Sequence, residues 1–264
     1  MTLLDWLQQT PNAHLVGECF EVQTSLVNAE KRLDTRAHLL PMSDSTLLNF
    51  GLGIAINGDC SVVEWPSDDL SSIAAWIQQL PESGAGALVI RVHVGNNIDW
   101  STLPEHPAVE VWTVASESQR SEVLQRALTQ RRTIILLESA ASMAWHKLEG
   151  LQPNEDALTQ HGTSSAHCVL VSSSLNAAVV QGAVDVLTEQ GVSIRWYEQH
   201  NVTQLDPSVL EYIFDVGRVV CVGLPSSWMS ALIQKTFWRL ENEPLFCTTD
   251  ETSIVQAVYT TLES

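Results

Sequence analysis

Basic residues are scarce in this chain of 264 residues. Lysine and arginine together number 13, against 31 aspartates and glutamates, which gives a formal net charge of -18. A surface with this excess repels phosphate backbones and anionic membranes, so we expect neither nucleic acid nor membrane as a partner. The charge favours solubility, and it would also suit a basic protein partner.

Long apolar runs are also missing, and we expect no signal peptide. No run of about 18 apolar residues occurs, so we expect no membrane-spanning helix. The amino-terminal stretch MTLLDWLQQTPNAH has no basic region ahead of an apolar one, unlike a signal peptide. We therefore expect a soluble, cytoplasmic protein. With 264 residues, 45% of them hydrophobic, the chain can form one large or two ordinary α/β domains.

Several common functional motifs are absent. The five cysteines form no CxxC pair, and the eight histidines show no HxH or HExxH spacing, so we predict no metal site. The sequence has no GxGxxG after a strand, no GxxxxGK[ST] and no GxSxG. These absences disfavour a dinucleotide-binding protein, a P-loop protein and a hydrolase with a serine nucleophile elbow. Four cysteines lie in apolar, strand-like runs and are expected to be buried thiols: Cys60, Cys168, Cys221 and Cys247.

What the sequence does contain is an alternation of short apolar runs with amphipathic helical patterns. This alternation predicts mostly parallel sheets covered by helices on both faces. In the first half, strands are expected at residues 14–18, 60–65, 87–92, 109–114 and 133–137, and helices at 1–12, 68–80 and 117–130. Asp68 or Asp69 is expected to cap the helix at 68–80.

The second half repeats the alternation. Strands are expected at 167–171, 193–197, 218–222 and 245–247, and helices at 175–190, from Asp206-Pro207, from Ser227 and from Ser253. The helix from Ser227 should turn Met229, Leu232, Ile233 and Phe237 inward. Residues 145–165 lack a period and contain glycine and proline, which favours a linker. We therefore predict two three-layer α/β domains at 1–150 and 166–264, joined by a linker at 151–165.

The stretch from Leu39 to Pro66 is unusual for its small residues. Ser43 or Asp44 can cap a helix there, and one side of that helix is almost bare because of Gly51, Gly53, Ala55 and Gly58. Each helical glycine costs roughly 0.5–1 kcal/mol relative to alanine. Such a cost suggests that another backbone or a ligand comes very close, and Asp44 is the acidic group best placed to meet it.

Several segments, in this order, resemble the beta subunit of the thiamine-diphosphate-dependent 2-oxoacid dehydrogenases. That subunit joins a transketolase-like pyrimidine-binding domain to a transketolase C-terminal domain. The likeness covers nearly the whole chain, and no single motif within it is decisive. It rests on LVGE, LPMSD before GLGIAINGDCSVVEW, ALVIRV, HPAVEVWTVASESQRSEVLQRAL, IILLES, HCVLVSSSLNAAVVQGAVDVLTEQGVSIRWYE and LDPSVLEYIFDVGRVVCV.

The resemblance implies thiamine diphosphate chemistry. A glutamate of the family's beta chain hydrogen-bonds the aminopyrimidine of the cofactor and promotes deprotonation of the thiazolium carbon. Asp44 corresponds to it, with a carboxylate one methylene shorter. The family's aromatic near the pyrimidine corresponds to Ser67, whereas Glu18, Arg91 and Glu138 match. Asp44 is thus the predicted catalytic residue, and Asp44, Glu18, Ser67 and Arg91 are the predicted cofactor-binding residues.

The resemblance also implies partners. The family holds the diphosphate and magnesium on an alpha chain with a GDG…N signature, which this sequence lacks. We therefore expect a homodimer that joins an alpha-like subunit in a heterotetramer and is inactive alone. Asp44, Ser67 and a shortened loop at residues 92–107 depart from the family pattern. They favour a second interpretation, in which the chain is a non-catalytic scaffold or regulatory relative of that subunit. A third reading is an unrelated flavodoxin-like or ligand-binding α/β protein.

Overall fold

A computed structural model describes residues 2–17, 32–40, 44–68, 70–95, 98–103, 106–141, 143–144, 158–162, 165–240 and 242–263. Side chains are described at all of these positions except Asp44 and residues 158–162. The chain forms two compact units. The first comprises Met1–Val94 and Thr102–Glu138, and the second comprises Gly95–Ser101 and Ser139–Ser264. The division after Glu138 falls twelve residues before the expected end of the first domain at residue 150.

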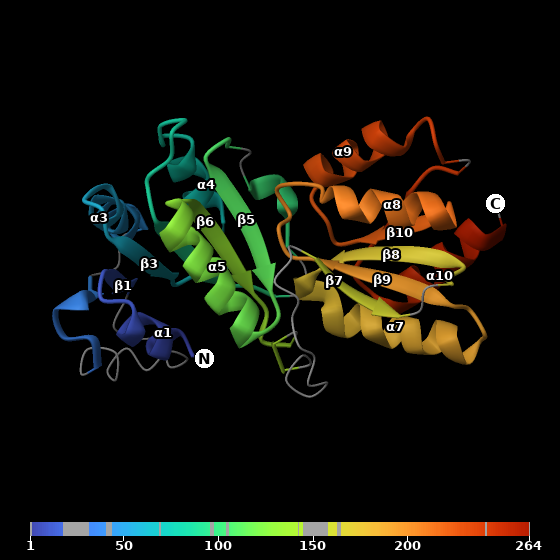
Figure 1. The fold of residues 1–264 in the computed structure, drawn as a ribbon, viewed down its shortest axis with the longest axis horizontal. Coiled ribbons are helices and arrows are strands. Elements are labelled where there is room, and N and C mark those ends of the chain that lie inside the picture. The colour runs from blue at the N-terminus through green and yellow to red at the C-terminus, as the bar shows by residue number, and fades with distance from the viewer. Residues whose placement is uncertain are drawn as a thin grey trace. The chain divides into compact units, whose positions relative to one another are not determined.

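The first unit is built on a six-stranded sheet in the order β2-β1-β3-β4-β6-β5 (Figure 1). Every neighbouring pair in this sheet is parallel. The strands are β1 Ala13–Gly17, β2 Ala37–Leu39, β3 Cys60–Trp65, β4 Leu88–His93, β5 Val109–Val114 and β6 Thr133–Glu138. The helices are α1 Leu3–Gln9, α3 Asp44–Ile56, α4 Ser71–Ile77 and α5 Glu117–Gln130, with the 3-10 turn η1 Asp34–Arg36. A second 3-10 turn, η2 Trp100–Thr102, begins in the second unit and ends at the first residue of the returning chain. The predicted mostly parallel α/β architecture is confirmed.

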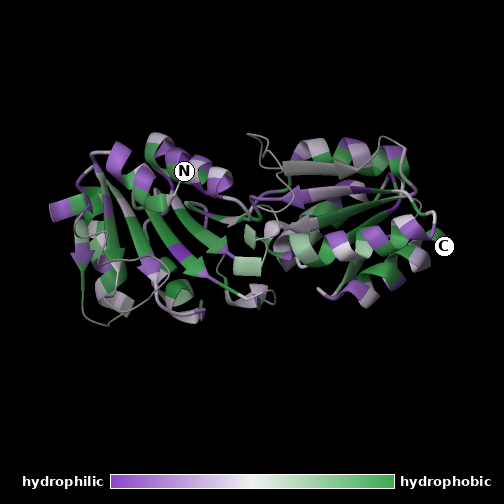
Figure 2. Cartoon of the chain, turned by 90° about the horizontal axis from the view of Figure 1, so that it is seen from below, coloured by the Kyte–Doolittle hydropathy of each residue, from purple (hydrophilic) through white to green (hydrophobic). Residues whose placement is uncertain are grey.

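Helices cover this sheet on both of its faces, which explains why its strands are apolar on both sides. Helix α1 packs beside α5, and α3 packs beside α4. Strands β5 and β6 are buried at every position, and β3 and β4 at all but one. Figure 2 shows these strands mainly in the colour of hydrophobic residues. Arg91 and Glu138 are charged exceptions inside this apolar layer.

The second unit contains a five-stranded sheet in the order β11-β10-β8-β9-β7. Its strands are β7 Leu158–Gly162, β8 Cys168–Ser173, β9 Ile194–Gln199, β10 Val219–Val222 and β11 Leu245–Cys247. Its helices are α7 Ala177–Glu189, α8 Pro207–Val216, α9 Ser226–Thr236 and α10 Glu251–Glu263, with the 3-10 turn η3 Ser174–Asn176. Residues from α7 and α10 share one hydrophobic cluster with β8, β9 and β10.

Strand β7 corrects the prediction of a linker at 151–165. Five residues of that segment pair antiparallel with β9, from Leu158 opposite Gln199 to Gly162 opposite Arg195. The other pairs of this sheet are parallel. The polar sequence of β7 hid it, because an edge strand can be held by its backbone hydrogen bonds without an apolar face of its own.

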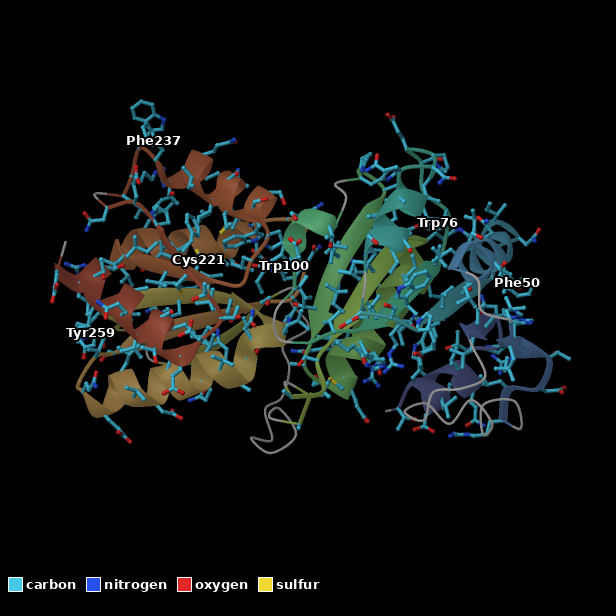
Figure 3. The ribbon with its side chains drawn as sticks, turned by 180° about the vertical axis from the view of Figure 1, so that it is seen from behind. Phe50, Trp76, Trp100, Cys221, Phe237 and Tyr259 are labelled. Atoms are coloured by element: carbon cyan, nitrogen blue, oxygen red, sulfur yellow. The ribbon has the colours of Figure 1, made fainter. Side chains whose placement is uncertain are left out.

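The inward face predicted for α9 is also partly wrong. Its buried residues are Trp228, Leu232 and Thr236, one row spaced by four residues. Ile233 is 41% exposed and Phe237 is 63% exposed, and the Phe237 label in Figure 3 lies at the outer end of this helix. Adjacent residues of a helix are rotated by about 100° about its axis, and this is the angle between the two rows. Both rows carry apolar residues, so the sequence pattern did not distinguish them.

One predicted helix cap is confirmed by the structure and another is wrong. Asp206 caps α8 as predicted, because its Oδ1 accepts a hydrogen bond from the Ser208 amide at 2.8 Å and Pro207 opens the helix. The predicted aspartate cap of α4 is wrong for Asp68: the N-cap of this helix is Leu70, with no side-chain cap. Asp69 lies outside the described residues.

The described cysteines are free thiols. Cys60, Cys168 and Cys221 are buried as expected, and Cys247 is partly buried. Burial raises the pKa of Cys60 and of Cys168 to about 12, so both are neutral near pH 7. Among the helices of the described residues, none combines the length and the apolar character needed to cross a membrane.

Candidate functional site

The order of strands in the first sheet reverses at β1, between β2 and β3. From β1 the chain adds β2 on one side and then β3 on the other. The registers pair Gly17 with Leu39 and Val16 with Val63, so the carboxyl ends of these three strands lie at one edge. Ligands of open parallel sheets bind outside the carboxyl ends of the strands at such a switch point.

The four predicted site residues follow, or lie within, strands at this edge. Asp44 begins α3, the first helix after β2. Ser67 is exposed and lies two residues beyond the end of β3. Arg91 is buried within β4. Glu18 is the next residue in sequence after β1 and lies outside the described residues. The topology therefore gathers three of the predicted positions, and their roles stay predictions.

Two of the small residues of α3 pack on their own sheet, which corrects the expectation that this whole side meets another molecule. A Cβ on Gly51 would lie 2.5 Å from Cγ2 of Val63 in β3. A Cβ on Gly86, just before β4, would lie 2.8 Å from the carbonyl oxygen of Ala55. Gly51 and Ala55 are both buried. Their small size lets α3 lie directly against the sheet.

Gly53 differs from Gly51, because it lies on the outer face of α3. A Cβ placed on it would meet no described atom within 4 Å. Phe50 and Ile56 flank it one helical turn away on either side, and Ile56 is 67% exposed. We call Phe50, Gly53 and Ile56 the outer face of α3. It combines exposed apolar side chains with a bare backbone, a combination suited to close packing of another element.

The carboxyl end of α3 is held by a long-range contact. Arg131 donates from Nη2 to the carbonyl of Ala55 at 3.1 Å and from Nη1 to the carbonyl of Gly58 at 2.9 Å. A cation at this end of a helix complements its dipole and satisfies carbonyls that have no helical partner. Arg131 thus helps to fix the helix that carries Asp44.

A buried ion network lies beside this edge, within the sheet. Arg91 donates from Nη1 to Glu64 Oε1 at 2.6 Å and from Nη2 to Glu138 Oε2 at 2.7 Å. Arg120, on α5, donates from Nε to Glu138 Oε1 at 2.6 Å. Two arginines thus clamp one carboxylate, and the network links β3, β4, β6 and α5. We call Glu64, Arg91, Arg120 and Glu138 the arginine–glutamate network.

The network favours the charged forms of Glu138 and Arg91. Burial raises the pKa of Glu138, but Arg91 and Arg120 lower it more, so the net pKa is about 2. Burial lowers the pKa of Arg91, and the carboxylates of Glu64 and Glu138 outweigh this and raise it. His93, whose Nε2 lies 4.0 Å from Glu64 Oε2, has its pKa lowered by burial and then by Arg91. The lowered pKa favours the neutral imidazole, which has one nitrogen that donates and one that accepts a hydrogen bond, at the end of β4.

Glu64 and Arg120 were not singled out from the sequence. A signal for them exists: Arg91 and Glu138 are lone charges in apolar strands, and buried charges require partners. Glu64 stands directly opposite Arg91 in the pairing of β3 with β4. The pairing of the two strands is a tertiary property. Neither this pairing nor the position of α5 could be predicted from the sequence.

The described residues favour only part of a thiamine diphosphate site. A carboxylate at the start of α3 suits the aminopyrimidine, which needs a hydrogen-bonding acid. Within the described ranges, no group of three or more His, Cys, Asp or Glu residues could hold a metal ion.

Comparison with known proteins identifies the class of fold. No protein-family model and no curated protein matches the sequence. Among solved structures, a split-gene transketolase described as an inactive beta4 tetramer aligns with a TM-score of 0.76 at 12% identity, over 99% of this chain and 95% of that chain. The chain therefore has the two-unit α/β fold of transketolase-like proteins.

A second solved structure shares this fold. It is a 2-oxoglutarate:ferredoxin oxidoreductase from Magnetococcus marinus with 2-oxoglutarate, coenzyme A and succinyl-CoA bound, and it aligns with a TM-score of 0.59 at 8% identity. The alignment covers 99% of this chain and 65% of that chain. This chain therefore spans just under two thirds of the length of that protein.

Proposed function

We propose that this chain is the pyrimidine-side subunit of a thiamine-diphosphate-dependent enzyme of the 2-oxoacid dehydrogenase or transketolase type. A second, alpha-like chain would hold the diphosphate and magnesium. The observation that carries the proposal is the end-to-end alignment with one part of a split transketolase, over 99% of this chain and 95% of the other. A chain with this same pair of units is a natural partner for a separate diphosphate-binding chain.

Asp44 would be the catalytic residue of this chain. It begins α3 next to the switch point of the sheet. The free amides in the first turn of a helix favour a negative charge there, which suits a carboxylate that accepts a hydrogen bond. Thiamine diphosphate, when bound, supplies the carbon that attacks a substrate carbonyl. The carboxylate of Asp44 would orient the aminopyrimidine by a hydrogen bond, which requires about 2.6–3.2 Å.

Arg91 would act mainly by fixing the site. Its two terminal nitrogens are occupied by Glu64 and Glu138, whereas its buried Nε has no hydrogen-bond partner among the described residues. A guanidinium held in this way is rigid and retains one donor. Glu18 and Ser67 would complete the pyrimidine side, as the sequence resemblance implies.

The outer face of α3 is the proposed contact for a second copy of this chain. Homodimerisation through this face would place the start of α3 near a subunit boundary. The split-gene transketolase with the same fold is described as a beta4 tetramer, which supports self-association of this chain. Gly53→Leu should weaken the dimer in sedimentation velocity, whereas Gln125→Leu, on the exposed side of α5, should not. An unchanged dimer in Gly53→Leu would refute this contact.

The catalytic proposal is tested by titrating thiamine diphosphate and magnesium into the chain in a calorimeter, with and without a candidate alpha chain. We expect binding only when both chains are present. Asp44→Asn should then lower turnover of the complex by about 10²-fold or more, and Asp44→Glu should retain activity. Absence of binding in both titrations would overturn the proposal.

The second candidate function is a non-catalytic scaffold or regulatory subunit. The observation that favours it is the replacement of the expected glutamate by Asp44 together with the exposed Ser67 where an aromatic is expected. A scaffold should bind the alpha chain as tightly after Asp44→Asn as before, with no cofactor uptake. A measured loss of turnover in Asp44→Asn would exclude it.

A further inference from the structure

The second unit contains a pocket that the proposed cofactor chemistry does not use. Its volume is about 370 Å³, and it is lined by Ile98, Trp100, Leu175, Asn176, Gly223, Cys247, Thr248, Thr249 and Asp250. All of these residues belong to the second unit, including Ile98 and Trp100 of the segment Gly95–Ser101. Pockets for small molecules have volumes upward of about 300 Å³, so a single small ligand fits.

The pocket lies at the switch point of the second sheet. From β8 the chain adds β9 on one side and β10 on the other. Asn176 follows the end of β8, Gly223 follows β10, and Thr248 follows β11. The carboxyl ends of three neighbouring parallel strands thus form one wall, at the position where open α/β sheets bind ligands.

The wall is closely fitted. Gly223 has a φ of +57°, and a Cβ added to it would overlap the Asn176 amide and lie 2.7 Å from Cγ2 of Thr249. A residue with a side chain would push both neighbours apart. Glycine at this position therefore keeps the ends of β8, β10 and β11 in mutual contact and leaves the space in front of them free.

Asn176 supplies an unused hydrogen-bond acceptor. Its side chain is 2% exposed, and its Nδ2 donates to Ser173 Oγ at 2.9 Å. That bond fixes the amide plane, and the buried Oδ1 accepts no hydrogen bond from any described residue. A buried acceptor without a donor is destabilising, so a pocket ligand with an N–H group would gain by supplying one.

The charges of the lining disfavour anions. It contains no lysine, arginine or histidine, and its one charged group is the carboxylate of Asp250. Hydrogen bonds from Ser253 and Thr248 lower the pKa of Asp250, so it is ionised at neutral pH. Both of its oxygens are engaged, because Oδ1 accepts from the Ser253 amide at 2.9 Å and Oδ2 from Thr248 Oγ1 at 2.7 Å. The start of α10 is therefore already neutralised by its own cap.

Trp100 provides an aromatic surface on this pocket, and it is labelled in Figure 3. Its side chain is only partly buried and lines the pocket, so part of the indole is accessible to a ligand. A flat ligand against a tryptophan gains dispersion and stacking energy that an aliphatic ligand does not. Leu175 and Ile98 add apolar contacts.

We propose that this pocket binds a small, planar, uncharged molecule with an N–H donor, of the nucleobase or aromatic-carboxamide class. The ligand lies against Trp100 and donates its N–H to Asn176 Oδ1. The site is separate from the proposed thiamine diphosphate site, which belongs to the first unit, so either proposal can fail without the other.

Isothermal titration of the full chain with adenosine, nicotinamide and inorganic phosphate tests the proposal. We expect adenosine or nicotinamide to bind and phosphate not to bind. Which of the two binds separates a nucleobase from an aromatic-carboxamide ligand. N6,N6-dimethyladenosine and N,N-dimethylnicotinamide keep the ring but lack the donor, and they should bind at least about tenfold more weakly than their parents.

Two variants locate the site. Trp100→Ala should weaken binding at least about tenfold, and Asn176→Leu should abolish the preference for N–H over dimethylated ligands. Trp238→Ala is the matched control, because Trp238 is 87% exposed, belongs to the same unit and does not line the pocket. The proposal is wrong if neither adenosine nor nicotinamide binds, if phosphate binds instead, if the dimethylated ligands bind as well as their parents, or if Trp100→Ala leaves binding unchanged.

Discussion

The carboxyl edges of the two sheets are filled in different ways, although the central strands of both sheets are parallel. At the edge of the first sheet, two arginines and two glutamates neutralise one another inside the protein. Near the edge of the second sheet, the buried polar residues include Ser174, whose Oγ lies 2.5 Å from His200 Nδ1, and Glu198, whose Oε1 lies 3.7 Å from the same nitrogen. A pocket lined in part by Leu175 and Asn176, the two residues after Ser174, lies at this edge.

The difference shows how the same sheet architecture can be rigid in one unit and able to accept a ligand in the other. A buried carboxylate held by two guanidinium groups is costly to disturb, because losing one partner leaves an uncompensated charge. Neutral amide and hydroxyl groups cost less to rearrange or to expose to a ligand. We therefore expect the first sheet to depend strongly on pH and the second to tolerate changes around its pocket.

The largest expected effect is that of Glu138→Gln. Removing this charge leaves Arg91 and Arg120 without their shared carboxylate and should lower the free energy of unfolding by about 3–5 kcal/mol. Urea unfolding measures this loss of stability, and amide hydrogen exchange measures it in β4 and β6. Glu110→Gln is the matched control in the same sheet, because its partner Arg126 is more exposed, and its loss should be smaller.

The same variant tests the pH dependence. The folded-state pKa of Glu138 is about 2, below the ordinary value of 4.5, so its stabilisation is complete above about pH 4.5 and is lost as the pH falls toward 2. Glu138→Gln should therefore show a flatter stability profile than the wild type over this range. Parallel profiles would contradict the assignment of this charge.

The second prediction compares two glycines of one helix. Gly51→Ala should destabilise the first unit by about 1–3 kcal/mol, because its Cβ would lie 2.5 Å from Cγ2 of Val63. Gly53→Ala should instead stabilise the isolated chain by about 0.5–1 kcal/mol, since its Cβ meets open space. Thermal unfolding of both variants decides this, and equal effects would contradict the two-sided description of α3.

The third prediction moves to the second unit. Asp206→Ala removes the side-chain acceptor for the Ser208 amide and should cost about 1 kcal/mol. Asp206→Asn, which keeps an acceptor oxygen, should lose much less. Chemical unfolding of the two variants measures the difference, and an equal loss in both would argue against the cap.

The smallest expected effect is that of Phe237→Ser. Phe237 is exposed beside a hollow of about 370 Å³ lined with Ile233, Leu240 and Phe246, so its removal should change the free energy of unfolding by less than about 0.5 kcal/mol. Leu232→Ala, one buried row away on the same helix, should cost about 2–5 kcal/mol. A large loss in Phe237→Ser would show that this aromatic is needed for folding.

Much of the fold was predictable because apolar runs and caps are local signals. The predicted bounds of β3 at 60–65, β5 at 109–114 and α5 at 117–130 are confirmed to the residue. The errors lie where the local signal was shared or missing. Strand β7 is polar and depends on its pairing with β9, and α9 carries two adjacent apolar rows of which packing buries one.

The candidate site was predictable only in part. The order of strands brings the carboxyl ends of β1, β2 and β3 to one edge, where Ser67 and Asp44 follow in the chain, and the roles of the predicted residues stay predictions. Glu64 and Arg120 became visible only from the strand register and the packing of α5. The pocket beside Asn176 had no sequence signal, since it joins residues from separate parts of the chain between Ile98 and Asp250.

The sequence by itself determined the alternation of strands and helices, the acidic surface and the lone charges in apolar strands, because each depends on neighbouring residues alone. The tertiary structure decided which charges pair, which glycine of α3 touches its own sheet and which aromatic residues stay exposed. Those outcomes depend on distances between segments far apart in the chain, and such distances are set only when the sheets assemble.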